Sequence, residues 1–290
     1  MKLLGGASAL VKKLGKHRLI LILIVFAVII GASLPPFMTA SCLTRQQTAA
    51  EIRTLETLRS MTRGGVLPAD EVVARIETDF PRTKAAALAR MVRARIKVRA
   101  NDYAGAATLL DTNLVRDHTS IGDYALFMRA NALEQTGKSA EARAAFDRLE
   151  GDYSSSIRAR EAKLRSADLL LKAGQPAALP ALLSELAAKD DPAALLLSAK
   201  AYTQSSDTTR ALAAYRRIYF FAPVSSESTQ AANAIPQLGS NLSPASAEEA
   251  IARADRFYAA NKYGDALQAY TDAIGKFASL ATTQNQLRRG

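Results

Sequence analysis

The chain has 290 residues, a mass of 31.0 kDa and a formal net charge of +11, with one cysteine and no tryptophan. Hydrophobic residues make up 49% of it, but aromatic residues only 6%, and much of the apolar fraction is alanine and leucine. This composition favours helices that pack closely through small side chains. It disfavours a β-sandwich, which is richer in β-branched and aromatic residues. We therefore predict an all-α fold.

Residues 1–42 are predicted to form a leader that is separate from the helical remainder, residues 43–290. An unbroken apolar run, LILILIVFAVIIGASL at residues 19–34, follows five basic residues in a segment without Asp or Glu. This order is typical of a secretory signal or an N-terminal membrane anchor, whose basic flank stays in the cytoplasm. We expect the remainder to lie in the bacterial cell envelope, on the periplasmic side and bound to the membrane through this segment.

The only cysteine, Cys42, lies just beyond the apolar run in the sequence FMTASC. This stretch resembles a bacterial lipobox, in which the cysteine is lipidated and becomes the mature N-terminus. Thr39 stands where a lipobox usually has leucine. Three interpretations stay open at this point: lipidation of Cys42, an uncleaved anchor over residues 19–38, and ordinary cleavage near Ala40.

The basic stretch ALARMVRARIKVRA at residues 87–100 is predicted to be a helix. Arg90, Arg93 and Lys97 share one face of it, because residues three and four apart lie on one side of a helix. Its buried stripe is predicted to be Leu88, Val92 and Ile96. The charged face is either solvated or in contact with an anionic surface, phospholipid or peptidoglycan. Nucleic acid is not expected as a partner, because the leader carries close to half of the net charge and no aromatic residues interleave the basic ones.

A repeated pattern follows, in which an alanine precedes a bulky residue by four positions. The copies are Ala106 with Leu110, Ala142 with Phe146, Ala211 with Tyr215, Ala266 with Tyr270, and a weaker one, Ala178 with Leu182. The leading alanines are separated by 36, 36, 33 and 55 residues, and three of these intervals are near the period of about 34 of tetratricopeptide repeats. Turn signals precede several copies, at Asn101-Asp102, Gly137-Lys138, Gly174-Gln175 and Asn261-Lys262.

These spacings predict units of helix, turn and helix. Alanine lets the two helices of a unit approach closely, and the bulky residue fills the space toward the next unit. Since no such unit buries its apolar face alone, the units must stack. We therefore predict a tetratricopeptide-like superhelical solenoid, preceded by the N-terminal apolar signal or anchor helix.

Three segments resemble the helical superhelix of soluble lytic murein transglycosylases. They are IGDYALFMRANALEQTGKSAEARAAFDRLEGDYSSSIRAREAKLRSADLLLKAG (121–174), ALLLSAKAYTQSSDTTRALAAYRRIYFFAPVSSESTQAA (194–232) and AEEAIARADRFYAANKYGDALQAYTDAI (247–274). The turn DYSSS has Ser154 where the family often has proline. The resemblance implies a non-catalytic domain that engages peptidoglycan and positions a separate C-terminal catalytic domain. That domain carries a Glu-Ser motif followed by a Gly-Leu-Met-Gln stretch.

No catalytic, cofactor or metal site is predicted within the chain. Glu227-Ser228 is not followed by a Gly-Leu-Met-Gln stretch and falls in a predicted turn. His17, His118 and one cysteine cannot supply a zinc site. Two hypotheses remain: the superhelical part of a lytic transglycosylase-like protein, or a stand-alone repeat scaffold, lipidated or not, that binds envelope proteins.

Overall fold

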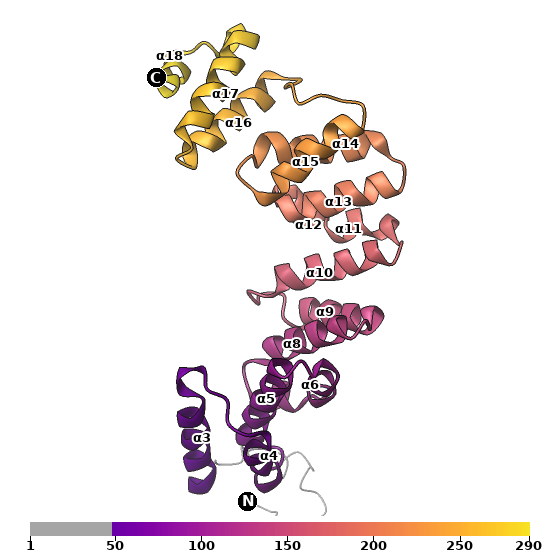
Figure 1. The fold of residues 1–290 in the computed structure, drawn as a ribbon, viewed down its shortest axis with the longest axis vertical. Coiled ribbons are helices and arrows are strands. Elements are labelled where there is room, and N and C mark those ends of the chain that lie inside the picture. The colour runs from indigo at the N-terminus through magenta and orange to yellow at the C-terminus, as the bar shows by residue number, and fades with distance from the viewer. Residues whose placement is uncertain (1–47) are drawn as a thin grey trace, which may run out of the picture. The chain divides into compact units, whose positions relative to one another are not determined.

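The structure, a computed structural model, describes residues 48–290. Every regular element among these residues is helical, which confirms the predicted all-α class (Figure 1). The predicted apolar segment 19–34 and Cys42 lie outside the described residues. None of the described helices is long and apolar enough to cross a membrane.

The chain divides into two units between Arg53 and Thr54. Of the first unit, the structure describes residues 48–53. They hold the beginning of helix α3 (Ala49–Thr62), whose first turn is capped because the Glu51 N–H donates to Thr48 Oγ1 at 3.2 Å. The second unit, Thr54–Gly290, holds the rest of α3 and all later elements.

The helices of the second unit follow one another with short turns (Figure 1). After α3 they are α4 (Asp70–Asp79), α5 (Lys84–Arg99), α6 (Tyr103–Leu109), α7 (Leu114–His118), α8 (Gly122–Gln135), α9 (Ser139–Asp152), α10 (Ala159–Lys172), α11 (Leu179–Leu182), α12 (Ser184–Ala188), α13 (Pro192–Gln204), α14 (Thr208–Phe221), α15 (Ser226–Gln237), α16 (Ala247–Ala259), α17 (Tyr263–Lys276) and α18 (Thr283–Arg289). Short 3₁₀ turns are η1 (Arg63–Gly65), η2 (Pro176–Ala178) and η3 (Ala278–Leu280). Five helix pairs follow one another: α5 with α6, α8 with α9, α10 with α11, α13 with α14, and α16 with α17. Contacts also join α4 to α5, α9 to α10 and α14 to α15.

One type of turn closes the first helix of every pair. Its central residue has a positive φ, between 58° and 75°, and the next residue donates its N–H to the carbonyl five residues back. The positive-φ residues are Asn101, Gly137, Gly174, Ser206 and Asn261. In the second pair, for example, Lys138 N–H donates to the Leu133 carbonyl at 3.0 Å. This is the Schellman arrangement, which satisfies the carbonyls at a helix end.

The turn sets the register of the second helix. The fifth and ninth residues after the positive-φ residue are at most 5% exposed in all five pairs. They are Ala106 and Leu110, Ala142 and Phe146, Leu179 and Leu183, Ala211 and Tyr215, and Ala266 and Tyr270. The prediction of the weaker copy, Ala178 with Leu182, was therefore wrong by one position. Ala178 is exposed at the end of η2, because the register is counted from Gly174 and not from the alanine.

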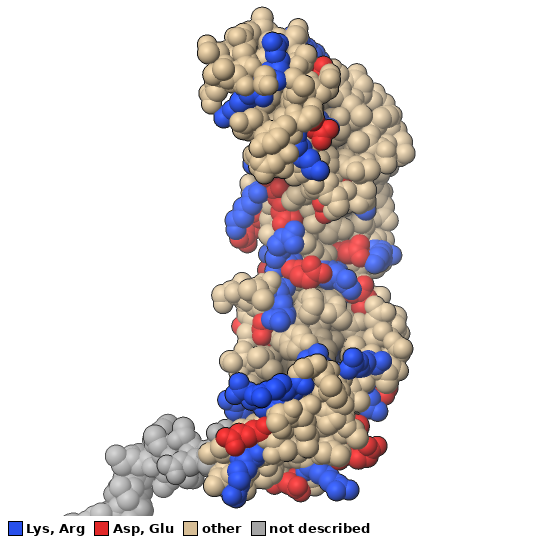
Figure 2. All heavy atoms as spheres, turned by 60° about the vertical axis from the view of Figure 1, so that its left-hand side comes forward, with Lys and Arg blue, Asp and Glu red and all other residues tan. Residues whose placement is uncertain are grey.

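On the face drawn in Figure 2, acidic and basic side chains of the second unit are interspersed. Many form ion pairs between elements that are adjacent in the stack. Arg165 pairs with Glu134 at 2.6 Å, joining α10 to α8, and Arg160 pairs with Asp191 at 2.6 Å, joining α10 to the start of α13. Most of the charge of the repeats is thus neutralised within the chain.

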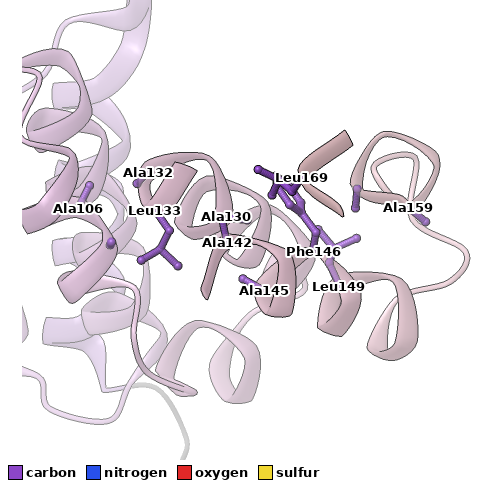
Figure 3. Packing of buried hydrophobic residues seen from close by; sticks show 12 residues of the cluster. Ala106, Ala130, Ala132, Leu133, Ala142, Ala145, Phe146, Leu149, Ala159 and Leu169 are labelled. Atoms are coloured by element: carbon purple, nitrogen blue, oxygen red, sulfur yellow. The ribbon is translucent and has the colours of Figure 1, made fainter. Parts of the chain in front are cut away.

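Apolar clusters bind successive pairs to one another. The cluster of α6, α8, α9 and α10 contains Phe146, Leu149 and Leu169, which lie together between the helices (Figure 3). The rings of Phe127 and Phe146 meet edge to face, with centroids 5.9 Å apart. Each of the four helices contributes buried alanines to this cluster. The repeats therefore stack through shared cores, which is consistent with a solenoid.

The interval of 55 residues between Ala211 and Ala266 contains one additional helix, α15, which is not followed by a second helix of its own pair. Helix α15 packs on α13 and α14 but is followed by residues 238–246, which form no helix. The next pair, α16 with α17, has a buried cluster drawn only from its own two helices. Polar groups hold this junction: Arg216 donates to the carbonyls of Asn241 and Ser243, at 3.2 and 3.1 Å, and pairs with Glu249.

Ser206 is the one turn residue among the five that is neither Gly nor Asn. The left-handed conformation costs an L-residue about 1–2 kcal/mol. Glycine avoids this cost, but its greater conformational freedom in the unfolded chain offsets about 0.5–1 kcal/mol of the gain. We expect Ser206→Gly to raise the free energy of unfolding by about 0.5–1 kcal/mol, measured by urea denaturation. Ser206→Val should lower it, and Asn261→Gly should change it less, because Asn tolerates this conformation. A destabilised Ser206→Gly variant would contradict the turn assignment.

Candidate binding groove

An open groove of about 630 Å³ lies beside α5, α6 and α8. We call it the α5–α8 groove. Its lining residues are Gly65, Leu67, Arg95, Val98, Arg99, Tyr103, Tyr124, Phe127, Met128, Asn131, Ala132 and Gln135. Beneath it, Met91 and Ala94 of α5 share a buried cluster with Ala125 and Met128 of α8, so the two walls are held together by a packed core.

The α5 wall of the groove is cationic. Arg95 and Arg99 are exposed and stand one helical turn apart. Arg95 has no hydrogen-bond or ion-pair partner among residues 48–290, and Arg99 donates only to the Gly65 carbonyl, at 3.3 Å. The described residues that line the groove include no Asp or Glu. Two guanidinium groups therefore face this space without a carboxylate to neutralise them.

The α8 wall of the groove carries two amides. Asn131 and Gln135 are also one turn apart, and neither side chain has a hydrogen-bond partner among the described residues. A side-chain amide offers one acceptor and two donor hydrogens. This wall can therefore satisfy both the N–H and the C=O of a peptide backbone.

The floor between the walls is apolar and aromatic. Val98 and Phe127 are half-buried there, and Met128 is buried. Two tyrosines at the edge are held in place: Tyr103 donates to Asn101 Oδ1 at 3.1 Å, and the Arg158 guanidinium lies 4.7 Å from the centre of the Tyr124 ring. The floor is thus largely preformed, which is the usual condition of a ligand site.

A second, smaller hollow of about 280 Å³ lies at the junction of α14 with α16. Arg253 is stacked there between the rings of Tyr219 and Phe257, at 3.8 and 4.9 Å. Its guanidinium donates to the Tyr219 carbonyl, and burial lowers its pKa. Asp265 and Asp272 also line this hollow, so its charge is mixed and favours no ligand of one sign.

The structure places the predicted anion-contact residues in ion pairs. Arg90 lies 2.6 Å from Glu77, Arg93 lies 2.8 Å from Asp70 and 3.1 Å from Glu77, and Lys97 lies 3.2 Å from Asp102. The hydrogen bond from Arg93 lowers the pKa of Asp70. Their contact with an anionic surface stays a prediction, and their neighbours Arg95 and Arg99 are among the basic residues of this helix that form no ion pair within residues 48–290.

The other residues that the sequence singled out form no joint site. Glu227 accepts from the Ser226 hydroxyl at 3.0 Å, and Ser228 is buried in the first turn of α15. This dipeptide lies in a helix and not, as the sequence suggested, in a turn. His118 is exposed at the end of α7. Residues 48–290 contain no group of three or more His, Cys, Asp and Glu residues that could hold a metal ion.

Comparison with known proteins places tetratricopeptide repeats in the region of the groove. A tetratricopeptide repeat family model matches residues 91–157, a range that includes most of the lining. Two solved structures are similar in part. The MamA RS-1 ArsTM double mutant is 18% identical with a TM-score of 0.39, over 69% of this chain and 97% of that one. MamA 41-end from Desulfovibrio magneticus RS-1 is 18% identical with a TM-score of 0.39, over 68% and 97%. No curated protein matches.

Proposed function

We propose that this chain is a protein-binding repeat scaffold of the bacterial cell envelope. Tetratricopeptide repeats generally mediate protein–protein interactions, through the extended surfaces that stacked helix pairs create. The observation that carries the proposal is the α5–α8 groove. Most of its lining lies within the matched residues, and the side chains of Arg95, Asn131 and Gln135 have no hydrogen-bond partner among residues 48–290.

The cell-envelope part of the proposal rests on the order of residues 1–42. A basic flank precedes the apolar run 19–34, and Cys42 follows it. In this proposal the leader binds the membrane and the repeats stand on its periplasmic side. The mass of the mature N-terminal peptide distinguishes the three forms: a lipid-modified Cys42, an intact residue 1, or a new end near Ala40.

In-cell photo-crosslinking tests the scaffold function. A photo-reactive residue at Gln135, on the wall of the groove, is expected to give adducts of discrete higher mass in cells that express the full chain. The matched control is Ile157, which is 89% exposed in the turn before α10 and does not line the groove. If neither site gives an adduct, the chain does not act as a scaffold through this face.

A second candidate function is the superhelical part of a lytic transglycosylase-like protein. One observation supports it: residues that carry the resemblance contact one another. The Asp123 carboxylate accepts from the Ser156 hydroxyl at 2.6 Å and from Arg158 at 3.1 Å, and Gly122 packs against the Tyr153 hydroxyl. The similar residues at 121–124 and 153–158 therefore form one packing motif.

The mass of the native protein separates the two candidates. An immunoblot against residues 43–290 is expected to give a band at or below 31.0 kDa for a scaffold. A band well above that mass would favour the transglycosylase-like protein. In both cases the full 290-residue chain is expected to release no product from purified peptidoglycan, and glycan cleavage by this chain would contradict both.

A further inference from the structure

We propose that the surface around the η1 turn docks on an anionic lipid bilayer. The surface consists of Arg59 of α3, Arg63 of η1, Val66 directly after η1, and Arg99 of α5; we call it the η1 patch. This inference rests on the part of the proposed function in which residues 1–42 bind the membrane. It adds a second contact, made by the repeats themselves and dependent on the charge of the lipid.

The η1 patch is cationic. Arg59 and Arg63 are exposed, and their side chains have no hydrogen-bond or ion-pair partner among residues 48–290. Arg99 is exposed as well and donates only to a backbone carbonyl of η1, at 3.3 Å. Residues 57–69 contain no Asp or Glu, and Glu56 is the nearest acidic residue of α3. The three guanidinium groups therefore leave the patch with a net positive charge.

The η1 turn is fixed at its base and open at its tip. Leu58, one turn before η1, is 4% exposed in a cluster with Val73 of α4, and the hydrogen bond from Arg99 joins η1 to α5. Gly64 and Gly65 have positive φ, 76° and 79°, and a Cβ at either would meet nothing within 4 Å. A flat surface can therefore approach the turn without displacing neighbouring side chains.

Val66 supplies the apolar part of the patch. It is 66% exposed and follows η1 directly. Proteins that lie on a bilayer combine apolar side chains, which enter the headgroup region, with cations that are attracted to anionic lipids. A guanidinium group can also bind phosphate oxygens through two hydrogen bonds. Both kinds of group are present here, and a soluble anion would bind the arginines without covering Val66.

The length of the connecting chain makes the bilayer the surface that the patch meets. Residues 35–48 join the apolar run to α3, and an extended chain of that length spans at most about 50 Å. If Cys42 carries a lipid, residues 43–48 span at most about 20 Å. Helix α3 is itself about 20 Å long. Anchoring by the leader therefore confines η1 near the membrane, and this high effective concentration lets a weak contact form.

A single tryptophan can report on the patch, because the chain has none. The test uses the full 290-residue Val66→Trp variant, reconstituted into phosphatidylcholine vesicles with or without phosphatidylglycerol. Only the anionic vesicles are expected to shift its emission to shorter wavelength and to allow quenching by brominated acyl chains, and added salt should reverse both effects. In this background Arg59→Gln/Arg63→Gln should lower the ratio of docked to free chains about 25-fold, because each cation near an anionic bilayer contributes about fivefold.

Two controls are matched to these variants. Ile157→Trp places tryptophan at a position that is 89% exposed and outside the patch, so its emission is expected to stay the same in both kinds of vesicle. Arg256→Gln/Arg289→Gln makes the same change of charge on α16 and α18, at two exposed arginines without a side-chain partner in the described chain. It should leave the emission of the Val66→Trp variant unchanged. Far-UV circular dichroism should be the same for both double variants, because Arg59 and Arg63 have no such partner either.

Flotation with the vesicles separates this inference from membrane binding by the leader. The leader is expected to bring the wild-type chain to the floating fraction with both lipid compositions and at high salt. Flotation with equal emission of Val66→Trp in neutral and anionic vesicles would overturn docking and leave anchoring intact. Equal shifts of the two tryptophan reporters, or equal effects of the two double variants, would overturn docking as well. If no vesicle carries the chain to the floating fraction, the anchored leader is rejected, and this inference with it.

Discussion

Replacing Phe146 with alanine is expected to lower the free energy of unfolding by about 3–5 kcal/mol. Phe146 is fully buried in the cluster that joins α6, α8, α9 and α10, and its ring packs edge to face on Phe127. Removing the ring leaves a cavity that alanines around it cannot fill. Urea denaturation of the full chain, followed by far-UV circular dichroism, measures the loss.

Hydrogen exchange locates the effect. In stacked repeats each unit contacts its neighbours only, so protection should fall in α8, α9 and α10 and persist in α16 and α17. Ile157→Ala is the matched control. It removes an apolar side chain that is 89% exposed, and should change stability by less than about 0.5 kcal/mol. Equal losses for the two variants would refute the role of Phe146 in stacking.

Gly122→Ala is expected to lower the free energy of unfolding by about 1–3 kcal/mol, although alanine is normally the better helix former. A Cβ at Gly122 would lie 2.1 Å from the Tyr153 hydroxyl and 3.2 Å from the Arg116 Cα. The tyrosine ring is rigid and partly buried, and burial raises the pKa of its hydroxyl. The turn after α9 must therefore move to admit the methyl group.

A second substitution tests this explanation. Tyr153→Phe removes the oxygen nearest to the new methyl group, so Gly122→Ala/Tyr153→Phe should recover part of the loss. Gly264→Ala, near the start of α17, is the control, because its Cβ would meet nothing within 4 Å. It should gain about 0.5–1 kcal/mol from helix propensity. If Gly122→Ala is stabilising as well, the contact with Tyr153 does not constrain α8.

The helix pairs and most of their turns could be predicted because their signals are local. Asn101, Gly137, Gly174 and Asn261 are residue types that adopt positive φ readily, and all four do so. The turn at Ser206 carried no such signal and was not predicted. The register of the α11–α12 segment was shifted by one residue, because alanine spacing was used where the turn at Gly174 decides which side chains are buried.

The groove could not be predicted, because it depends on which charges meet across helices. The sequence shows that Arg90, Arg93 and Lys97 share a face. It does not show that α4 brings Glu77 and Asp70 to that face. The cations that line the groove are Arg95 and Arg99, which lie beside that face. Which basic residues form ion pairs depends on tertiary contacts, which the sequence does not show. The aligned spacing of Arg95 and Arg99 with Asn131 and Gln135 was present in the sequence, but only the contact of α5 with α8 gives it meaning.

The junction between α14 and α16 has a mechanical consequence. Elsewhere the pairs share buried apolar clusters. Here Arg216 and Lys276 bind the carbonyls of the 238–246 segment, Arg253 of α16 stacks on Tyr219 of α14, and α16 and α17 keep their own buried cluster. Separating these few polar contacts exposes little apolar surface, whereas separating a shared apolar cluster exposes much more. This join is therefore the compliant point of the array. We therefore expect the α16–α17 pair to separate from α14 before the pairs that share a buried cluster separate from one another.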